Sequence, residues 1–198
     1  MKYSRSLLAS FFFLVMSLSI YIVHVEYFHV NVVLYSAILD ACSAAVISGG
    51  LVFGLKYFEV LNTFEKIQLT VIWLLVGYAL AITVPTIIDR SLSFYILEKI
   101  HQRGGGIKYA QFNEVFTQEY VKEHRLVDVR LTEQLESGTI IIENGCVKIT
   151  DRGLRLAAFS RFFRKHFLPK HRLLMGQYSD DLTDPFRNSV KAVDYECN

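Results

Sequence analysis

The chain has 198 residues, of which 52% are hydrophobic, and its mean hydropathy is +0.30. Its 21 basic and 19 acidic residues give a net charge of +2, and its three cysteines form no CxxC pair and no cluster with histidine, which excludes the usual zinc sites. The hydrophobic excess lies almost entirely before Asp89, so an apolar region precedes a polar one.

Charge divides the chain into four predicted parts. Residues 1–89 hold four Lys/Arg and five Asp/Glu, and residues 90–153 hold nine of each. Residues 154–174 hold six basic residues and no acid, whereas residues 175–198 hold two basic and five acidic residues. We interpret the four parts as a transmembrane region, a neutral domain, a basic amphipathic helix and an acidic tail.

Three apolar runs, at about 7–23, 32–58 and 69–88, predict three transmembrane helices. The first run follows Lys2 and Arg5, as the apolar part of a signal peptide follows its basic start. The run is long for a signal peptide, and no small-residue cleavage site follows it. We therefore expect a retained helix.

Small residues at helical spacing in the second and third runs predict close packing of helix backbones in lipid. They are Ala37, Ala41, Ala45, Gly49, Gly50, Gly54, Gly77 and Ala81. Two interpretations stay open: packing within this chain, or a surface for another membrane subunit.

Asp40 is the one acid well inside an apolar run. A carboxylate in the membrane is costly and faces a partner or a polar cavity. Three interpretations stay open: a solvated or neutral acid near the headgroups, a role in pairing helices, and conduction of ions or protons.

The polar region predicts the order helix, short strand, helix, helix, β-hairpin, helix. Apolar residues at helical spacing indicate helices over 91–103, 110–123 and 125–137, with Ile107–Tyr109 as the short strand. Two β-rich runs flank Asn144-Gly145, which is a strong hairpin signal. A last helix is expected from Leu154.

The stretch VRLTEQLESGTIIIENGCVKITDRG, residues 129–153, resembles part of the winged-helix domain of bacterial and archaeal regulators. Such domains often show a third helix ending in L-x-x-x-G and a wing closing on L-T-x-x-G. Leu135–Gly138 matches the first with one residue fewer, and Ile149–Gly153 matches the second with Ile in place of Leu. The resemblance covers about residues 90–167 and implies a small α+β domain attached to the α-helical membrane region.

In DNA-binding members of that family the third helix enters the major groove, which makes Arg125, Arg130 and Lys148 the candidate DNA contacts. Residues 124–136 carry more acids than arginines, and the domain is neutral, so it lacks the charge that supplies affinity for phosphates. We therefore expect the fold to contact protein rather than nucleic acid.

The basic segment combines an aromatic stripe with flanking cations: Phe159, Arg161, Phe163, Arg164, Lys165 and Phe167. This pattern is typical of a helix in the interface of an anionic membrane. The alternative is a closing helix whose aromatics are buried in the domain core. In the tail, Asp180, Asp181 and Asp184 lack EF-hand spacing, and we interpret them as solvated in a loose segment.

Motifs for catalysis are missing from the sequence: there is no P-loop, GxGxxG, HExxH or GxSxG, and no two histidines stand at ligand spacing on an expected helix. We expect no catalytic, cofactor-binding or metal-binding residues. A disulfide between Cys146 and Cys197 is also considered, but the sequence supports it less than the other expectations.

These patterns favour a non-enzymatic accessory or assembly subunit of a bacterial inner membrane. Its partners would be another membrane protein or further copies of itself, together with an anionic lipid surface. Lys2 and Arg5 argue for an inside N-terminus, but the resemblance favours a cytoplasmic C-terminal domain, which we expect. The alternatives are a membrane-anchored transcriptional regulator and a small transport component that uses Asp40.

Overall fold

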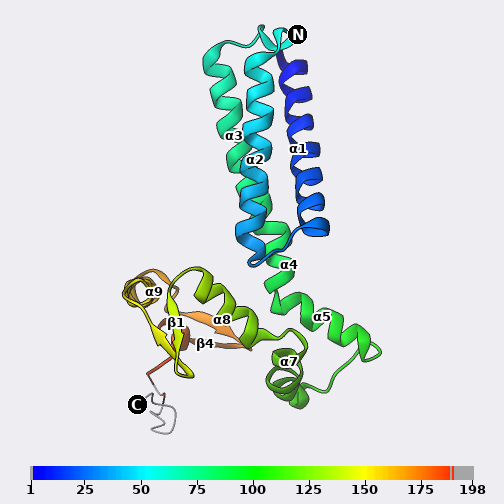
Figure 1. The fold of residues 1–198 in the computed structure, drawn as a ribbon. Coiled ribbons are helices and arrows are strands. Elements are labelled where there is room, and N and C mark those ends of the chain that lie inside the picture. The colour runs from blue at the N-terminus through cyan, green and yellow to red at the C-terminus, as the bar shows by residue number, and fades with distance from the viewer. Residues whose placement is uncertain (1, 188, 190–198) are drawn as a thin grey trace. The chain divides into compact units, whose positions relative to one another are not determined.

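The computed structural model describes residues 2–187 and 189 of the chain. These residues are mostly helical, with two small antiparallel sheets of two strands each (Figure 1). The chain divides into two compact units, Met1–Asp128 and Val129–Asn198, which we call unit 1 and unit 2. Unit 1 holds the apolar helices, and unit 2 holds both sheets.

Three described helices are long and apolar enough to cross a membrane. They are α1 (Lys2–Tyr27), α2 (Val33–Gly54) and a third that comprises α3 (Thr63–Ala81), a π-helical turn η2 (Ile82–Thr86) and α4 (Ile87–Arg90). The helices lie side by side and alternate in direction, so the N-terminus and the loop between α2 and α3 share one end (Figure 1). The prediction of three apolar helices is confirmed.

The boundaries differ from the apolar runs in both directions. α1 and α3 begin several residues earlier than the runs, because helical hydrogen bonding continues into polar flanking residues. The second run reaches Phe58, but α2 ends at Gly54 and a 3₁₀ turn, η1 (Lys56–Phe58), follows it. Apolar character therefore extends past the end of this helix.

The core of the bundle is built from small residues on α2 and large rings on its neighbours. Ala44 and Ala45 are fully buried, and the ring of Phe13 stacks on Trp73 with centroids 5.5 Å apart. The Trp73 indole Nε1 donates to Ser10 Oγ at 3.0 Å, which satisfies its only donor. This pair fastens α1 to α3.

Polar contacts close the end of the bundle that holds the N-terminus. Asn62 caps α3 in a capping box with Glu65, whose side chain also binds the Lys2 ammonium at 2.8 Å. Arg5 donates to the Tyr57 carbonyl and lies over the Tyr57 ring. The loop between α2 and α3 is thereby held to the first turn of α1.

The turn η2 is π-helical because Pro85 lies inside the helix. Proline has no N–H and its ring collides with the carbonyl four residues earlier, and one wider turn relieves both problems. The Thr86 hydroxyl donates to the Ala81 carbonyl at 2.8 Å, which replaces a lost backbone donor.

Helix α5 (Leu92–Gln102) follows α4 after the single residue Ser91, whose hydroxyl caps it. A second helical segment then comprises η3 (Tyr109–Gln111), α6 (Phe112–Glu114), the π turn η4 (Val115–Tyr120) and α7 (Val121–Glu123). Tyr95, Val115 and Tyr120 form the core between the two.

The expected strand at Ile107–Tyr109 is wrong. Ile107 packs against the Tyr95 cluster, and Tyr109 already belongs to η3. Each sheet within the described residues has only two strands, so no third strand pairs with this segment. Its backbone therefore turns into the next helix instead of extending.

Helix α8 (Leu126–Glu136) leads into β1 (Ile140–Glu143) and β2 (Cys146–Ile149), which pair antiparallel with Glu143 opposite Cys146. Asn144 and Gly145 both have positive φ, as this two-residue turn requires. Helix α9 (Asp151–Phe167) begins at the Thr150 cap and ends two residues before Pro169.

A second hairpin, β3 (Arg172–Leu174) with β4 (Gln177–Ser179), and the turn η5 (Asp181–Thr183) follow α9. The sequence analysis missed them, because three-residue strands leave almost no periodic signal. Residues 188 and 190–198 of the predicted tail lie outside the described residues. They include Cys197, so the expected Cys146–Cys197 disulfide lies outside them too.

Candidate functional site

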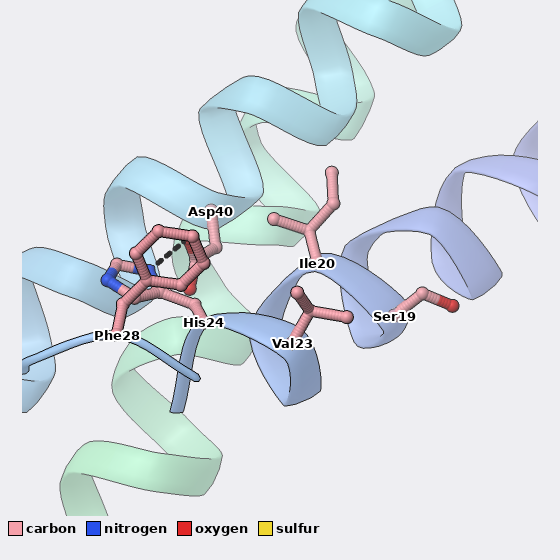
Figure 2. A pocket seen from close by; sticks show the side chains of 6 residues that line it. All are labelled: Ser19, Ile20, Val23, His24, Phe28 and Asp40. Carbon is pink, nitrogen blue, oxygen red and sulfur yellow. Dashed lines mark hydrogen bonds and ion pairs between the residues drawn. The ribbon is translucent and has the colours of Figure 1, made fainter. Parts of the chain in front are cut away.

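The bundle of apolar helices contains a hydrogen bond between a histidine of α1 and an aspartate of α2 (Figure 2). His24 Nδ1 lies 2.7 Å from Asp40 Oδ1. The Asp40 side chain is only 6% exposed and that of His24 20%. The ring of Phe28 meets the imidazole edge-on, with centroids 5.8 Å apart. The carboxylate is thus shielded by aromatic rings on the α1 side.

Helix geometry sets the depth of this pair. Asp40 is the eighth residue of α2, roughly 10 Å along the axis from the helix start at 1.5 Å per residue. His24 stands one turn before the end of α1, so both residues belong to the end of the bundle that leads into α5. At this depth a carboxylate leaves bulk water, and its cost is offset by the imidazole partner.

One oxygen of Asp40 has no partner. Among the described residues no donor reaches Asp40 Oδ2, although the atom is buried. Buried polar atoms in native proteins nearly always make hydrogen bonds. Asp40 also lines two cavities: one of about 370 Å³ beside His24 and Phe28, and one of about 580 Å³ that reaches Pro85 and Asp89.

His24 is the residue of this pair that the sequence analysis did not single out. It lies just after the first apolar run, and no second histidine stands at ligand spacing from it on an expected helix. Its pairing with Asp40 depends on how α1 and α2 are rotated toward each other, and the sequence alone does not give that rotation.

The predicted small residues separate into two groups. Ala37, Ala41, Ala45, Gly49, Gly77 and Ala81 are buried in the bundle. A Cβ on Gly77 would lie 2.9 Å from the Ala41 Cβ, so α2 and α3 approach most closely here. Gly50 and Gly54 are exposed, and a Cβ on either would meet nothing within 4 Å. Gly50 and Gly54, which form a GxxxG pair, therefore face away from the other helices of the bundle.

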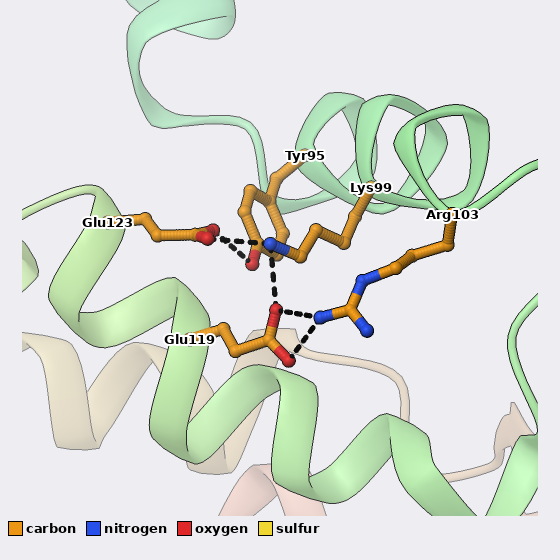
Figure 3. Close-up of polar contacts among 5 residues, drawn as sticks. All are labelled: Tyr95, Lys99, Arg103, Glu119 and Glu123. Atoms are coloured by element: carbon orange, nitrogen blue, oxygen red, sulfur yellow. Dashed lines mark hydrogen bonds and ion pairs between the residues drawn. The ribbon is translucent and has the colours of Figure 1, made fainter.

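A polar network joins α5 to the segment that ends in α7 (Figure 3). Lys99 Nζ lies 2.6 Å from Glu123 Oε1 and 2.7 Å from Glu119 Oε2. The Tyr95 hydroxyl donates to Glu123 at 2.8 Å, and Arg103 donates to both oxygens of Glu119. Each of the five side chains therefore has at least one hydrogen-bond partner within the network.

The network shifts the pKa values of its members. The ammonium of Lys99 is the main cause that lowers the pKa of Glu119 and of Glu123. The hydrogen bonds that Lys99 donates to Glu119 and Glu123 raise the pKa of its ammonium. Burial and the hydrogen bond to Glu123 raise the pKa of Tyr95 to about 12. These shifts all favour the paired, charged state of the acids and the lysine, and they fit a structural clamp.

The predicted membrane-surface residues lie on α9, and their aromatic side chains are exposed. Phe159 is 62%, Phe163 44% and Phe167 65% exposed. Arg164 lies over the ring of Phe186, 5.7 Å from its centroid. Within the described residues the aromatic stripe therefore has no core to fill.

The candidate DNA contacts are held in local ion pairs. Arg125 binds Asp128 at 2.9 Å, and Arg130 binds Glu133 at 2.8 Å. Lys148 lies 3.4 Å from Glu143 across the hairpin. Exposed pairs of this kind are weak, but each neutralises the cation that a phosphate would need.

No group of three or more His, Cys, Asp or Glu among the described residues is arranged to hold a metal ion. The side chains of the tail acids Asp180 and Asp181 are 55% and 68% exposed, and both bind the Arg187 guanidinium, at 2.7 and 2.6 Å. The pKa of each carboxyl is lowered, for Asp180 chiefly by Arg187 and for Asp181 chiefly by the Ser179 hydrogen bond.

No protein-family model, curated protein or solved structure matches this chain. Its function has to be argued from its own residues.

Proposed function

We propose that the chain is a non-enzymatic accessory or assembly subunit of an inner membrane, whose helix–hairpin region contacts a partner at the membrane surface. The observation that carries this proposal is the exposure of unit 2. Among its described residues, no apolar side chain is buried. A unit of this size needs a hydrophobic core, so a second surface has to supply the missing burial.

The β1–β2 hairpin illustrates the deficit. Ile142, on one strand, is 47% exposed, and Val147 and Ile149, on the same face of the other strand, are 47% and 52% exposed. An isolated two-stranded hairpin is marginally stable in water, and it needs a third strand or a covering helix. A protein surface laid against these residues would provide that cover.

Helix α9 supports the bilayer as part of the docking surface. Residues 154–174 carry six basic residues and no acid, and the phenylalanines among them are exposed. Cations attract anionic headgroups, and aromatic rings insert at the boundary of the acyl chains. The interpretation of α9 as a closing helix with a buried aromatic stripe is disfavoured by this exposure.

The orientation of the chain belongs to the same proposal. The anionic lipid that a basic helix needs is concentrated in the cytoplasmic leaflet, which favours a cytoplasmic unit 2. With three crossings the N-terminus then lies outside, and the basic residues Lys2 and Arg5 oppose this. Their opposition is reduced because Lys2 is paired with Glu65.

A membrane-anchored regulator remains the second candidate function. The order helix, helix, helix, hairpin, helix over residues 92–167 is the order of a winged-helix domain, and it supports that identity. The ion pairs of Arg125, Arg130 and Lys148 argue against DNA as the partner. Salt-dependent binding of the full chain to duplex DNA, lost when these three residues are substituted, would promote this candidate.

The direct test is purification of the full chain from its native membrane in several mild detergents, followed by native mass spectrometry. We expect a co-purifying protein or a second copy, which the Val147→Glu variant should lose, because Val147 lies on the exposed face of the hairpin. The matched control is Val127→Glu, because Val127 is an exposed valine of unit 1, 57% exposed against 47% for Val147. A strictly monomeric chain with no companion in every detergent would contradict the proposal.

A further inference from the structure

The larger cavity of the membrane bundle has the size of a ligand site. Its volume is about 580 Å³, within the range of roughly 300–1,000 Å³ that small-molecule pockets occupy. It runs from Leu14 in the middle of α1 to Asp89 at the end of the bundle, and the π turn at Pro85 forms part of its wall. Wider helical turns of this kind are frequent at functional sites.

The cavity walls carry acids and no base. Asp40 and Asp89 line it together with Ser17 and Tyr21, and no Lys, Arg or His of the described residues does. The rest of the lining is apolar. A groove filled only by acyl chains would need no carboxylate, and carboxylates are costly at this place. A ligand with a positive charge and an apolar body would satisfy both parts of the wall.

The unpaired oxygen of Asp40 restricts the kind of cation further. The Asp40 side chain is only 6% exposed. Its Oδ2 receives no hydrogen bond from the described residues. The missing partner is an N–H or O–H donor, which a primary ammonium has and a quaternary ammonium lacks. A divalent metal would need several oxygen ligands, and the described residues form no such group.

We propose that this cavity binds the primary ammonium group of an amphiphile. The ammonium donates to the free oxygen of Asp40, Asp89 adds a second negative charge at the mouth, and the apolar chain lies along Leu14, Leu18 and Leu80. His24 holds the other oxygen of Asp40 and so fixes the orientation of this side chain. The amine can come from a free alkylamine or from the headgroup of an ethanolamine lipid.

Three probes of equal chain length test the recognition: dodecylammonium, dodecyltrimethylammonium and dodecanol. Each is titrated into the full chain in an uncharged maltoside detergent, and each dissociation constant is corrected for that probe's own partition into the micelle before the ratios are taken. We expect dodecylammonium to bind at least about tenfold more tightly than either of the others, since one charge-assisted hydrogen bond contributes on that order. Equal affinity for the three probes would overturn the proposal.

Variants locate the site. Asp40→Asn should bring the ratio of amine to alcohol affinity close to one, and Asp89→Asn should lower it less. Glu59→Gln, which removes an acid from the loop at the opposite end, should leave the ratio unchanged. Leu14→Trp fills the cavity and should abolish binding of both amine and alcohol, so it keeps the test decisive if Asp40→Asn does not fold. An unchanged ratio in both aspartate variants would refute the assignment.

A lipid arm separates the two sources of amine. The full chain is exchanged into mixed phosphatidylethanolamine and phosphatidylcholine, and retained lipid is counted by native mass spectrometry. Preferential retention of phosphatidylethanolamine that is lost in Asp40→Asn supports the lipid headgroup. Equal retention, combined with tight dodecylammonium binding, supports a free alkylamine.

Discussion

At the scale of single residues, one glycine and one buried polar pair constrain how the helices of the bundle pack. Gly77 allows α3 to approach Ala41 of α2, since even a methyl group would lie 2.9 Å from the Ala41 Cβ. Asp40 and His24 form the buried pair that α1 and α2 share. The first is a steric constraint and the second an electrostatic one, so their substitutions should behave differently.

Gly77→Ala should destabilise the bundle, although alanine favours helix. Gly50→Ala is the matched control, because Gly50 lies in a helix with nothing within 4 Å of an added Cβ. Both variants gain up to about 1 kcal/mol of helix propensity, but only Gly77→Ala adds overpacking of about 1–3 kcal/mol. The free energy of unfolding in detergent measures the difference. Rescue of Gly77→Ala by Ala41→Gly would locate the cause, and equal stability of the two single variants would exclude it.

His24→Phe should cost about 3–5 kcal/mol, because it leaves the Asp40 carboxylate buried without a partner. Replacement of both residues, His24→Phe with Asp40→Leu, should recover most of that loss, since an apolar pair needs no compensation. Thermal unfolding in micelles is the measurement, with His29→Phe as the exposed control. A double variant less stable than the single one would show that the pair does more than satisfy Asp40.

At the scale of elements, the clamp between α5 and α7 makes a pH-dependent prediction. The folded-state pKa values of Glu119 and Glu123 are lowered, so their contribution to stability is present above the unfolded value of about 4.3. It is lost as pH falls through the lower folded values. Lys99 and Tyr95 are shifted upward and keep their contribution until the pH rises above about 10.

Glu123→Gln should therefore weaken the α5–α7 contact at pH 7 and have a smaller effect at pH 3. Hydrogen exchange of the amides in residues 92–123 measures this as the ratio of variant to wild-type rates at each pH. Because Glu123 is 45% exposed, a change of only a few-fold is expected. Glu114→Gln, at an exposed position of the same segment, should change neither ratio. A variant effect that is the same at both pH values would rule out the ionic contribution.

Gly153→Ala should separate α9 from the first hairpin. A Cβ there would lie 2.2 Å from the Thr139 carbonyl oxygen, which accepts the Thr150 amide at 3.0 Å. Loss of about 1–3 kcal/mol is expected from such overpacking. Amide exchange at Thr150 and along β2 reports it, and Gly106→Ala, with open space around the added methyl, is the control.

Most elements could be predicted from the sequence, and the misses have physical reasons. The three apolar helices, the Asn144-Gly145 hairpin and the end of α9 before Pro169 follow from length, turn chemistry and proline. The short strand at Ile107 was wrong because a β-like run forms a strand only if a partner strand accepts its hydrogen bonds. The π turns at Pro85 and at Val115–Tyr120 have no periodic signature distinct from an α-helix.

The candidate site was half predictable. Asp40 stood out as an isolated acid, and Ala37, Ala41 and Ala45 stood out as a stripe of small residues, all of which the structure buries. His24 and the cavity did not, because they depend on which helix faces lie opposite each other. A single sequence gives the period of each face but not how far each helix is rotated about its own axis.

At the scale of the whole molecule, the two units differ in how complete they are. Unit 1 has a core of buried residues around Phe13, Ala44 and Trp73, and a second one around Tyr95. Unit 2 buries Thr139 and Gly153 but no apolar side chain among its described residues. This difference between the two units is the basis of the proposed subunit role.

Reporter fusions test directly whether the three apolar helices each cross the membrane. A reporter active on only one side of the membrane is attached after His29, after Glu59 or after Asn198 of the otherwise intact preceding sequence. The loop at His29 and the C-terminus should lie on one side, and the loop at Glu59 on the other. If the fusions after Glu59 and Asn198 report the same side, the helix of Thr63–Arg90 does not cross the membrane, and the topology with three crossings is wrong.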